Sequence, residues 1–171
     1  MPHEPIDPVG IEWSRVSEKY LKVRVISALI GHVVFVVILS VPLVMRLLGV
    51  WTWPAEWIAW ALPIAGLIWT IIDVLFIIPR QVRAIGYAER QEDLLIRSGI
   101  MFRKLMVVPY GRMQYVDVEA GPVDRAFGLC KVKMHTASPS ANPEIPGIPE
   151  TEGARLREQL SARGEAKLAG L

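Results

Sequence analysis

The sequence predicts an α+β membrane protein in which a two-helix transmembrane hairpin precedes an antiparallel β-domain that a C-terminal helix caps. Three observations support this fold class. Two long apolar blocks account for much of the 52% hydrophobic content. After the second block, apolar residues alternate with polar ones, as in half-buried strands. An amphipathic pattern with helical spacing then follows. The expected boundaries are a cytosolic juxtamembrane segment at 1–24, transmembrane helices at 25–46 and 57–79, a short extracytoplasmic loop at 47–56, the β-domain at 80–163 and a flexible tail at 164–171.

The first apolar block, VISALIGHVVFVVILSVPLVM at Val25–Met45, has no formally charged residue between Arg24 and Arg46. Its length suffices for one bilayer crossing in helical conformation. The second block, Trp57–Ile78, is similarly apolar apart from Asp73. A cleaved signal peptide is a poor fit, because the first block follows a mostly polar segment, exceeds an h-region in length and lacks a small-residue cleavage site. We therefore expect two spans.

Basic residues flank the predicted hairpin unequally. The short connecting loop offers only Arg46, whereas the outer ends of the two spans carry Arg15, Lys19, Lys22, Arg24, Arg80, Arg83 and Arg90. Because Lys and Arg are retained on the cytoplasmic side, we expect a multi-pass protein of the bacterial plasma (inner) membrane with both termini in the cytosol. Indoles anchor at the headgroup level, and around the loop lie Trp51, Trp53, Trp57 and Trp60.

Two polar residues lie inside the predicted spans at matching depth. Counting helical rise, His32 lies roughly 10 Å and Asp73 roughly 9 Å in from the cytoplasmic side. Ionisable groups in a membrane seek partners, so one hypothesis is an interhelical hydrogen bond between them. The alternative is that each side chain reaches headgroup water independently.

The segment before the first span has apolar residues at helical spacing, namely Trp13, Val16, Tyr20 and Val23. One interpretation of residues 9–23 is a juxtamembrane helix lying on the inner leaflet. The other is a plain cytosolic extension of the first span.

Residues 116–120 and 130–136 alternate between apolar and polar, which predicts two paired strands. Their charges favour an antiparallel register in which Asp117 faces Lys133 and Glu119 faces Lys131. A slip of one residue would turn the apolar face outward. In this register Cys130 points inward as an inert, small hydrophobe; the alternative is a reactive thiol.

Turn and breaker residues predict the remaining connections. The stretch GPVDRAFGL at 121–129 has glycines for unusual backbone angles, Phe127 to plug a small barrel and Arg125 to bond backbone carbonyls or contact a ligand. Ser98 and Gly99 predict a tight hairpin. Proline-rich residues 137–149 predict a loop. From Glu150 the pattern predicts a helix whose apolar positions are Ala154, Leu156 and Leu160, with fraying beyond Arg163.

Three segments carry a resemblance to a known family. They are VPYGRMQ at 108–114, GPVDRAFGL at 121–129 and the Thr136-Ala137 pair that ends a strand. Together with the two preceding spans, they resemble the bacterial pleckstrin-homology (PH) domain of the YdbS-like membrane protein family. The resemblance covers most of the chain. It implies a PH-like curved antiparallel β-sheet, or partly open barrel, of about seven strands capped by the C-terminal helix.

The sequence contains no phosphate-binding glycine loop, no metal-spaced histidine helix and no nucleophile elbow. We therefore expect no enzyme, no cofactor, no metal and no nucleic-acid partner. The leading hypothesis is a membrane-tethered module that binds a membrane or cytosolic protein, or a second copy of the chain. Its candidate contact residues are Tyr110, Arg112 and Arg125.

Two other functions are compatible with the same residues. One is sensing of anionic lipid by the PH-like domain and its basic flanks, through Arg80, Arg83, Arg97, Arg103 and Lys104. The other is a subunit of a transport complex or of a complex that resists membrane-active peptides.

Overall fold

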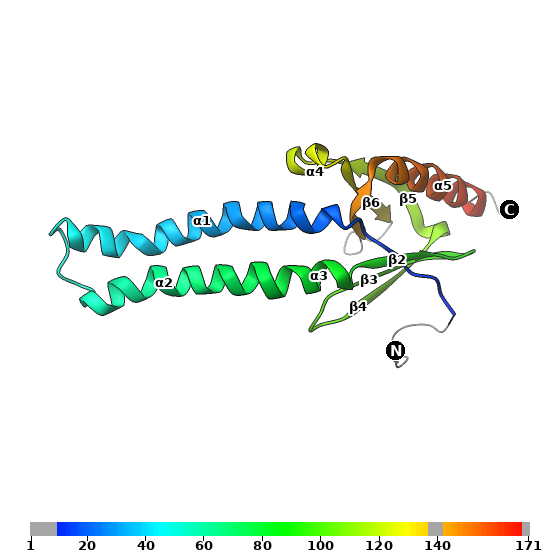
Figure 1. Ribbon diagram of the computed structural model, residues 1–171. Helices are drawn as coiled ribbons and strands as arrows, with labels where there is room; N and C mark the ends of the chain where they lie inside the picture. The colour runs from blue at the N-terminus through cyan, green and yellow to red at the C-terminus, as the bar shows by residue number, and fades with distance from the viewer. Residues whose placement is uncertain (1–9, 137–141, 169–171) are drawn as a thin grey trace. The chain divides into compact units, whose positions relative to one another are not determined.

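A computed structural model describes residues 10–136 and 142–168 of the chain. The chain divides into two compact units. One unit is Arg24–Pro79, and the other joins Met1–Val23 to Arg80–Leu171. The second unit therefore takes residues from both sides of the helical hairpin (Figure 1).

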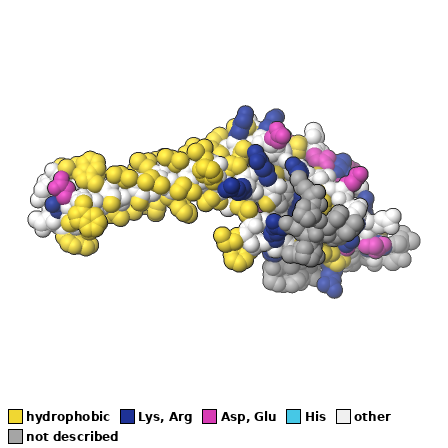
Figure 2. All heavy atoms as spheres, turned by 60° about the horizontal axis from the view of Figure 1, so that its bottom comes forward, with side chains coloured by type: hydrophobic (Ala, Val, Ile, Leu, Met, Phe, Trp, Pro, Cys, Tyr) yellow, Lys and Arg dark blue, Asp and Glu magenta, His cyan; other side chains and the backbone are white. Residues whose placement is uncertain are grey.

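The hairpin unit is built from two long apolar helices. The first is α1 (Lys19–Leu47); the second runs continuously through α2 (Glu56–Ile72), the π-helical turn η1 (Asp73–Ile77) and α3 (Ile78–Ala84). Each is 29 residues long, and their mean hydropathies are 2.6 and 2.3. Both continue as helix beyond the expected spans into the basic flanks, where long polar side chains still favour helix. On the face that Figure 2 shows, hydrophobic side chains cover most of the hairpin, with charged side chains at its free end, as expected of a helix pair that crosses a membrane.

The segment before the first span is helical only in part: a helix on the inner leaflet is the wrong interpretation for residues 10–18, whereas 19–23 do extend the first span. Strand β1 (Ser14–Arg15) pairs antiparallel with β2 (Gly86–Glu89), and helix begins only at Lys19. The backbone N–H of Ser17 donates to the carbonyl of Gly147 at 2.9 Å. We call residues 13–20 the N-terminal strap.

Contacts inside the β-domain explain why the strap is not helical before Lys19. The guanidinium of Arg97 lies 4.5 Å from the ring centroid of Trp13. Val16 is buried, at 8% exposure. Gly86 permits the approach of β1, because a Cβ there would lie 3.3 Å from the Ser14 carbonyl oxygen. Trp13, Val16 and Tyr20, whose spacing suggested one face of a helix, therefore pack against the β-domain instead.

Two antiparallel sheets form the β-domain, so the predicted fold class is confirmed. Their orders are β1-β2-β3-β4 and β5-β6-β7, which makes seven strands among the described residues. The remaining strands are β3 (Asp93–Ser98), β4 (Lys104–Pro109), β5 (Met113–Glu119), β6 (Leu129–Thr136) and β7 (Glu144–Pro149). Helix α5 (Glu150–Leu168) packs on β5, β6 and β7. The core between them includes Leu94, Leu95, Val132, Met134, Ile145, Ile148, Leu156 and Leu160.

The predicted register of β5 and β6 is confirmed, because Asp117 pairs with Lys133 and Glu119 with Lys131. The ion pairs nevertheless run diagonally. Lys133 Nζ lies 2.7 Å from Glu119 Oε2, and His135 Nε2 lies 3.4 Å from Asp117 Oδ2. Diagonal neighbours in a twisted antiparallel pair are within reach of long side chains. Each ion pair therefore joins a residue of β6 to the residue two positions along β5 from its backbone partner.

Two expectations near the C-terminus are corrected. Residues 144–149 form β7 rather than loop, whereas 137–141 lie outside the described residues. Helix α5 continues past Arg163 to Leu168, and its Lys167 Nζ lies 2.8 Å from Glu92 Oε1. The expected tail is thus helical at 164–168, and 169–171 lie outside the described residues.

The inward face of α5 also differs from the expected one. Leu156 and Leu160 are fully buried as predicted, but Ala154 is exposed and Gly153 takes its place. A Cβ on Gly153 would lie 2.3 Å from the Sγ of Cys130. The helix therefore turns its glycine to the sheet because the approach is too close for a methyl group.

The GPVDRAFGL stretch contains a short helix, α4 (Pro122–Ala126). Gly128 has φ +65°, which favours glycine, but Gly121 has φ −68° and needs no special freedom. The Gly121 N–H instead donates to the Asp124 carboxylate at 3.3 Å. Phe127 is only half-buried.

Candidate functional site

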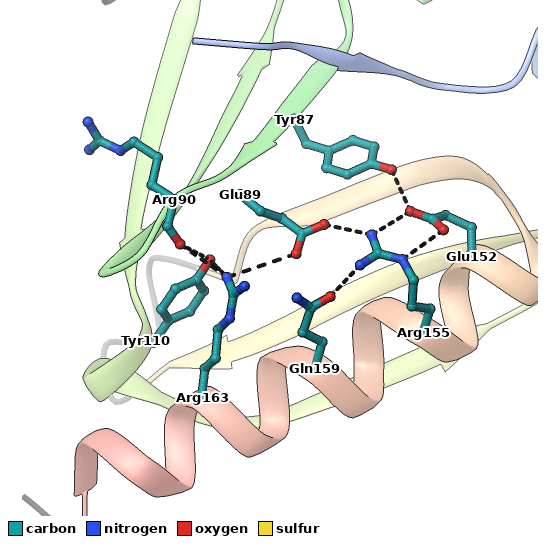
Figure 3. A network of polar contacts seen from close by, with 8 residues as sticks. All are labelled: Tyr87, Glu89, Arg90, Tyr110, Glu152, Arg155, Gln159 and Arg163. Carbon is teal, nitrogen blue, oxygen red and sulfur yellow. Dashed lines mark hydrogen bonds and ion pairs between the residues drawn. The ribbon is translucent and has the colours of Figure 1, made fainter. Parts of the chain in front are cut away.

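A polar network fastens α5 across β2 (Figure 3). Its residues are Tyr87, Glu89, Arg90, Tyr110, Glu152, Arg155, Gln159 and Arg163. Arg155 is central, because its Nη2 donates at 2.6 Å to both Glu89 Oε1 and Glu152 Oε1. Tyr87 donates its hydroxyl to Glu152 at 3.1 Å.

The electrostatics of this network indicate a structural role. Burial, helped by the negative charge of Glu152, raises the pKa of Tyr87 to about 12. The hydrogen bond from Arg155 lowers the pKa of Glu152, and bonds to Glu152 and Glu89 raise the pKa of Arg155. These groups keep one protonation state near neutral pH, whereas an acid–base catalyst needs a pKa close to its working pH. The network is suited to holding the helix in place.

Tyr110, expected as a surface contact, lies inside this network, so that expectation is corrected. Its side chain is fully buried. Its hydroxyl donates to the Arg90 carbonyl at 2.9 Å and accepts from Arg163 Nη1 at 2.9 Å. Burial raises the pKa of Tyr110. Tyr110 therefore holds α5 in place through Arg163, and its buried ring is not available to a partner.

The other two expected contact residues are exposed but lie in separate elements. Arg112 ends the 3-10 turn η2 (Tyr110–Arg112), and Arg125 lies in α4. Arg125 Nη2 donates to the Ala120 carbonyl at 3.4 Å, which is the architectural role that the sequence predicts for it. Of the three candidates, Tyr110 is therefore buried, and the two exposed ones lie on different elements.

The β3–β4 connection exposes apolar side chains that the sequence interpretation missed. The ladder closes at Ser98 opposite Lys104, so the turn is the five residues 99–103 rather than a tight Ser98-Gly99 turn. Ile100, Met101 and Phe102 are 39%, 87% and 86% exposed. We call residues 100–104 the hairpin tip. The signal in the sequence is IMFRK, an apolar run joined directly to two basic residues.

The five basic residues expected to contact lipid occupy three places. Arg80 and Arg83 are exposed on α3. Arg103 and Lys104 are exposed in the hairpin tip. Arg97 is half-buried, and its guanidinium lies over the ring of Trp13 in the strap.

Beside the tip, β4 forms the edge of its sheet. In the described residues, β4 pairs with β3 alone. Val107 on this strand is 48% exposed. A pocket of about 160 Å³ lies next to the strand, lined by Lys104 and Met106 and by Glu144 of β7, among others. This volume is below that of sites for drug-sized ligands and is comparable to one large side chain.

In the hairpin unit, His32 and Asp73 lie close together. The Nε2 of His32 is 3.5 Å from Asp73 Oδ2, and its Nδ1 is 2.7 Å from the Ala28 carbonyl oxygen. With Nδ1–H donating to that carbonyl, Nε2 is the nitrogen left for the carboxylate. A hydrogen bond across this contact needs a proton on Nε2 or on Asp73. Asp73 also opens the π-helical turn η1, a feature frequent at functional sites.

Cys130 is buried at 1% exposure, and burial raises the pKa of its thiol. Its environment is that of an inert thiol. His135, five residues along β6, instead stacks on Tyr115 with ring centroids 4.2 Å apart. Within 10–136 and 142–168, no group of three or more His, Cys, Asp and Glu is placed to hold a metal ion.

Comparisons with known proteins agree with the motifs. A family model described as the bacterial PH domain matches residues 21–164. The UPF0699 transmembrane protein YdbS of Bacillus subtilis (strain 168) is 31% identical over 109 residues, covering 62% of this chain and 67% of YdbS. A crystal structure of a DUF1696 family protein with a pleckstrin-homology domain, from Shewanella loihica PV-4, is similar at 11% identity and a TM-score of 0.37. That similarity covers 47% of this chain and 70% of the Shewanella chain.

Proposed function

This chain belongs to the bacterial PH domain family, and on that basis we propose that its PH-like domain is a non-catalytic interaction module held at the cytosolic face of the bacterial plasma membrane. Two apolar helices form the anchor. The domain is joined to them with almost no linker: three residues separate β1 from α1, and Ile85 alone separates α3 from β2. Tethering of this kind raises the effective concentration of the module near membrane components, so a modest affinity is sufficient.

The pairing of β1 with β2 supports a topology with both termini on the same side. Ser14 precedes the first helix and Tyr87 follows the second, yet the two residues are backbone partners in one sheet. A sheet cannot form across a bilayer, so the hairpin has to return to the side on which it started. The excess of Lys and Arg at the outer helix ends supports the cytosol as that side.

Cysteine accessibility tests this topology. Native Cys130 is buried, so engineered cysteines report alone on intact cells. We expect Thr52→Cys, in the connecting loop, to react with a membrane-impermeant maleimide. Glu158→Cys, exposed on α5, should react only after the cells are permeabilised. Labelling of Glu158→Cys in intact cells would contradict the proposed orientation.

The partner that the geometry favours is an extended segment of a protein. The observation that carries this is the edge of β4, which pairs with β3 alone among residues 10–136 and 142–168 and has a pocket for one side chain beside it. An exposed edge strand can accept a peptide as an additional strand, in which alternate side chains supply specificity. We infer that such a segment pairs along β4 and places one side chain between Met106 and Glu144.

Photo-crosslinking in living cells tests this surface. A photoreactive amino acid at Val107 should give a discrete adduct with another protein. The matched control is Tyr115, which is 53% exposed on the other sheet. Met106→Trp, which fills the pocket, should abolish the Val107 adduct. Equal adducts at the two positions, or none at Val107, would refute the edge as a binding surface.

A further inference from the structure

The hairpin tip exposes more apolar surface than a turn in water normally does. Met101 and Phe102 are adjacent and 87% and 86% exposed, with Ile100 beside them at 39%. Single exposed apolar residues are common and need no explanation. Three consecutive ones on a turn, followed at once by Arg103 and Lys104, form the combination found on segments that lie at membrane interfaces.

The turn presents these side chains in a defined conformation. Gly99 has φ +92°, and a Cβ at this position would lie 2.1 Å from the Phe102 carbonyl oxygen. The chain therefore doubles back tightly on itself, and glycine is required. A tip held in this way loses less conformational entropy when it binds than a free loop would.

The strand register locates the tip at the end of the sheet from which both membrane helices leave. Gly86, just after the second helix, pairs with Arg15 on one side and with Arg97 on the other. Arg97 is followed directly by Ser98, where the β3–β4 ladder closes. Figure 1 shows the start of β2 and the turn between β3 and β4 at the same end of the sheet. A five-residue turn extends at most about 8 Å beyond that end.

We propose that the hairpin tip inserts into the headgroup region of the bilayer that anchors the chain. Met101 and Phe102 enter the boundary between headgroups and acyl chains, while Arg103 and Lys104 remain among anionic headgroups. The occupant is a lipid surface because the domain has almost no linker and the register puts the tip at the end of the sheet whose strands connect to both helices. Contact is through apolar insertion and charge, so no headgroup pocket is required. The tip adjoins the β4 edge at Lys104, and its insertion would orient the PH-like domain on the membrane.

Depth measurement on the full chain tests the insertion. The protein is reconstituted in nanodiscs containing phosphatidylglycerol, with a nitroxide attached at Met101→Cys or, as a control, at Tyr115→Cys. The expected result is that the label at 101 collides with dissolved oxygen and is shielded from a water-soluble nickel chelate, with the reverse at 115. A label at 101 that the chelate reaches as readily as at 115 would overturn the proposal. Shielding from both reagents would also overturn it, because that pattern indicates contact with protein.

Proteolysis provides a second readout that does not need a label. Trypsin cuts after Arg103 and Lys104, and insertion should protect this site in nanodiscs. Replacing both Met101 and Phe102 by serine should accelerate the cleavage about tenfold, as partial burial of one large apolar side chain implies. Tyr115→Ser, which removes an exposed aromatic ring elsewhere, should leave the rate unchanged. An unchanged rate in the double variant would refute insertion.

Discussion

Replacing Gly147 by alanine tests whether the N-terminal strap is part of the PH-like domain. Gly147 lies in β7 with φ +69°, and its carbonyl accepts the Ser17 N–H. A Cβ at this position would lie 2.3 Å from Cγ and 2.5 Å from Cβ of Tyr20. Neither atom is at the flexible end of the tyrosine side chain. The strap therefore has to move to accommodate the methyl group.

The magnitude has two parts, and Gly128→Ala separates them. The left-handed backbone costs an L-residue about 1–2 kcal/mol at either glycine. The clash with Tyr20 adds the cost of overpacking, about 1–3 kcal/mol. Gly128 has φ +65° but nothing within 4 Å of its Cβ position, so it carries only the first cost. The second cost falls on the strap alone.

Hydrogen exchange of the full chain in nanodiscs measures the effect on the strap. An added cost of 1–3 kcal/mol should speed exchange in residues 13–20 roughly 5- to 150-fold in Gly147→Ala. Gly128→Ala should leave these amides close to wild type. Adding Tyr20→Ala to Gly147→Ala should remove the clash and restore part of the protection. If both glycine variants exchange identically over 13–20, the strap is not docked on β7 and our account of the domain is wrong.

Three further predictions concern the core, the polar network and the spans. Leu160→Ala, at a fully buried position of α5, should lower the free energy of unfolding of the PH-like domain by about 2–5 kcal/mol in a denaturant titration. The pKa of Glu152 is lowered in the folded state, so its contribution to stability is present above the ordinary carboxyl pKa and fades as the pH falls below about 4. Glu152→Gln should flatten the melting temperature across that acidic range, and an unchanged profile would contradict the assignment. His32→Ala and Asp73→Asn should show a coupling of about 0.6 kcal/mol in a double-mutant cycle of hairpin stability, whereas additive effects would mean that the two side chains act separately.

Local patterns predicted the elements whose residues contact their sequence neighbours or a nearby strand. The two spans were evident from continuous hydropathy, which needs no partner to be recognised. The register of β5 and β6 followed from alternation and charge within about twenty residues. The hairpin tip could also have been found, since IMFRK places apolar residues in a predicted turn.

Strand β7 was missed because its prolines favour a loop in a sequence-based prediction. The segment EIPGIP reads as loop, since proline cannot donate to a ladder. In the structure β7 is the outer strand of its sheet, where an N–H on the outward side needs no strand partner. The identity of an edge strand depends on sheet order, and sheet order is not a local property.

The sequence by itself determined the two spans, the β5–β6 pair, the C-terminal helix and the family, because hydropathy, alternation and short motifs each extend over only a few dozen residues. Tertiary structure decided that β1, at Ser14–Arg15, completes a sheet whose other strands follow the hairpin, that Tyr110 is buried beneath α5, and that Gly153 rather than Ala154 faces the core. Each of these depends on which surface a residue meets across 20 to 130 positions of chain. The spacing of side chains along the sequence does not identify partners so far apart. The partners are set only when the whole domain packs closely.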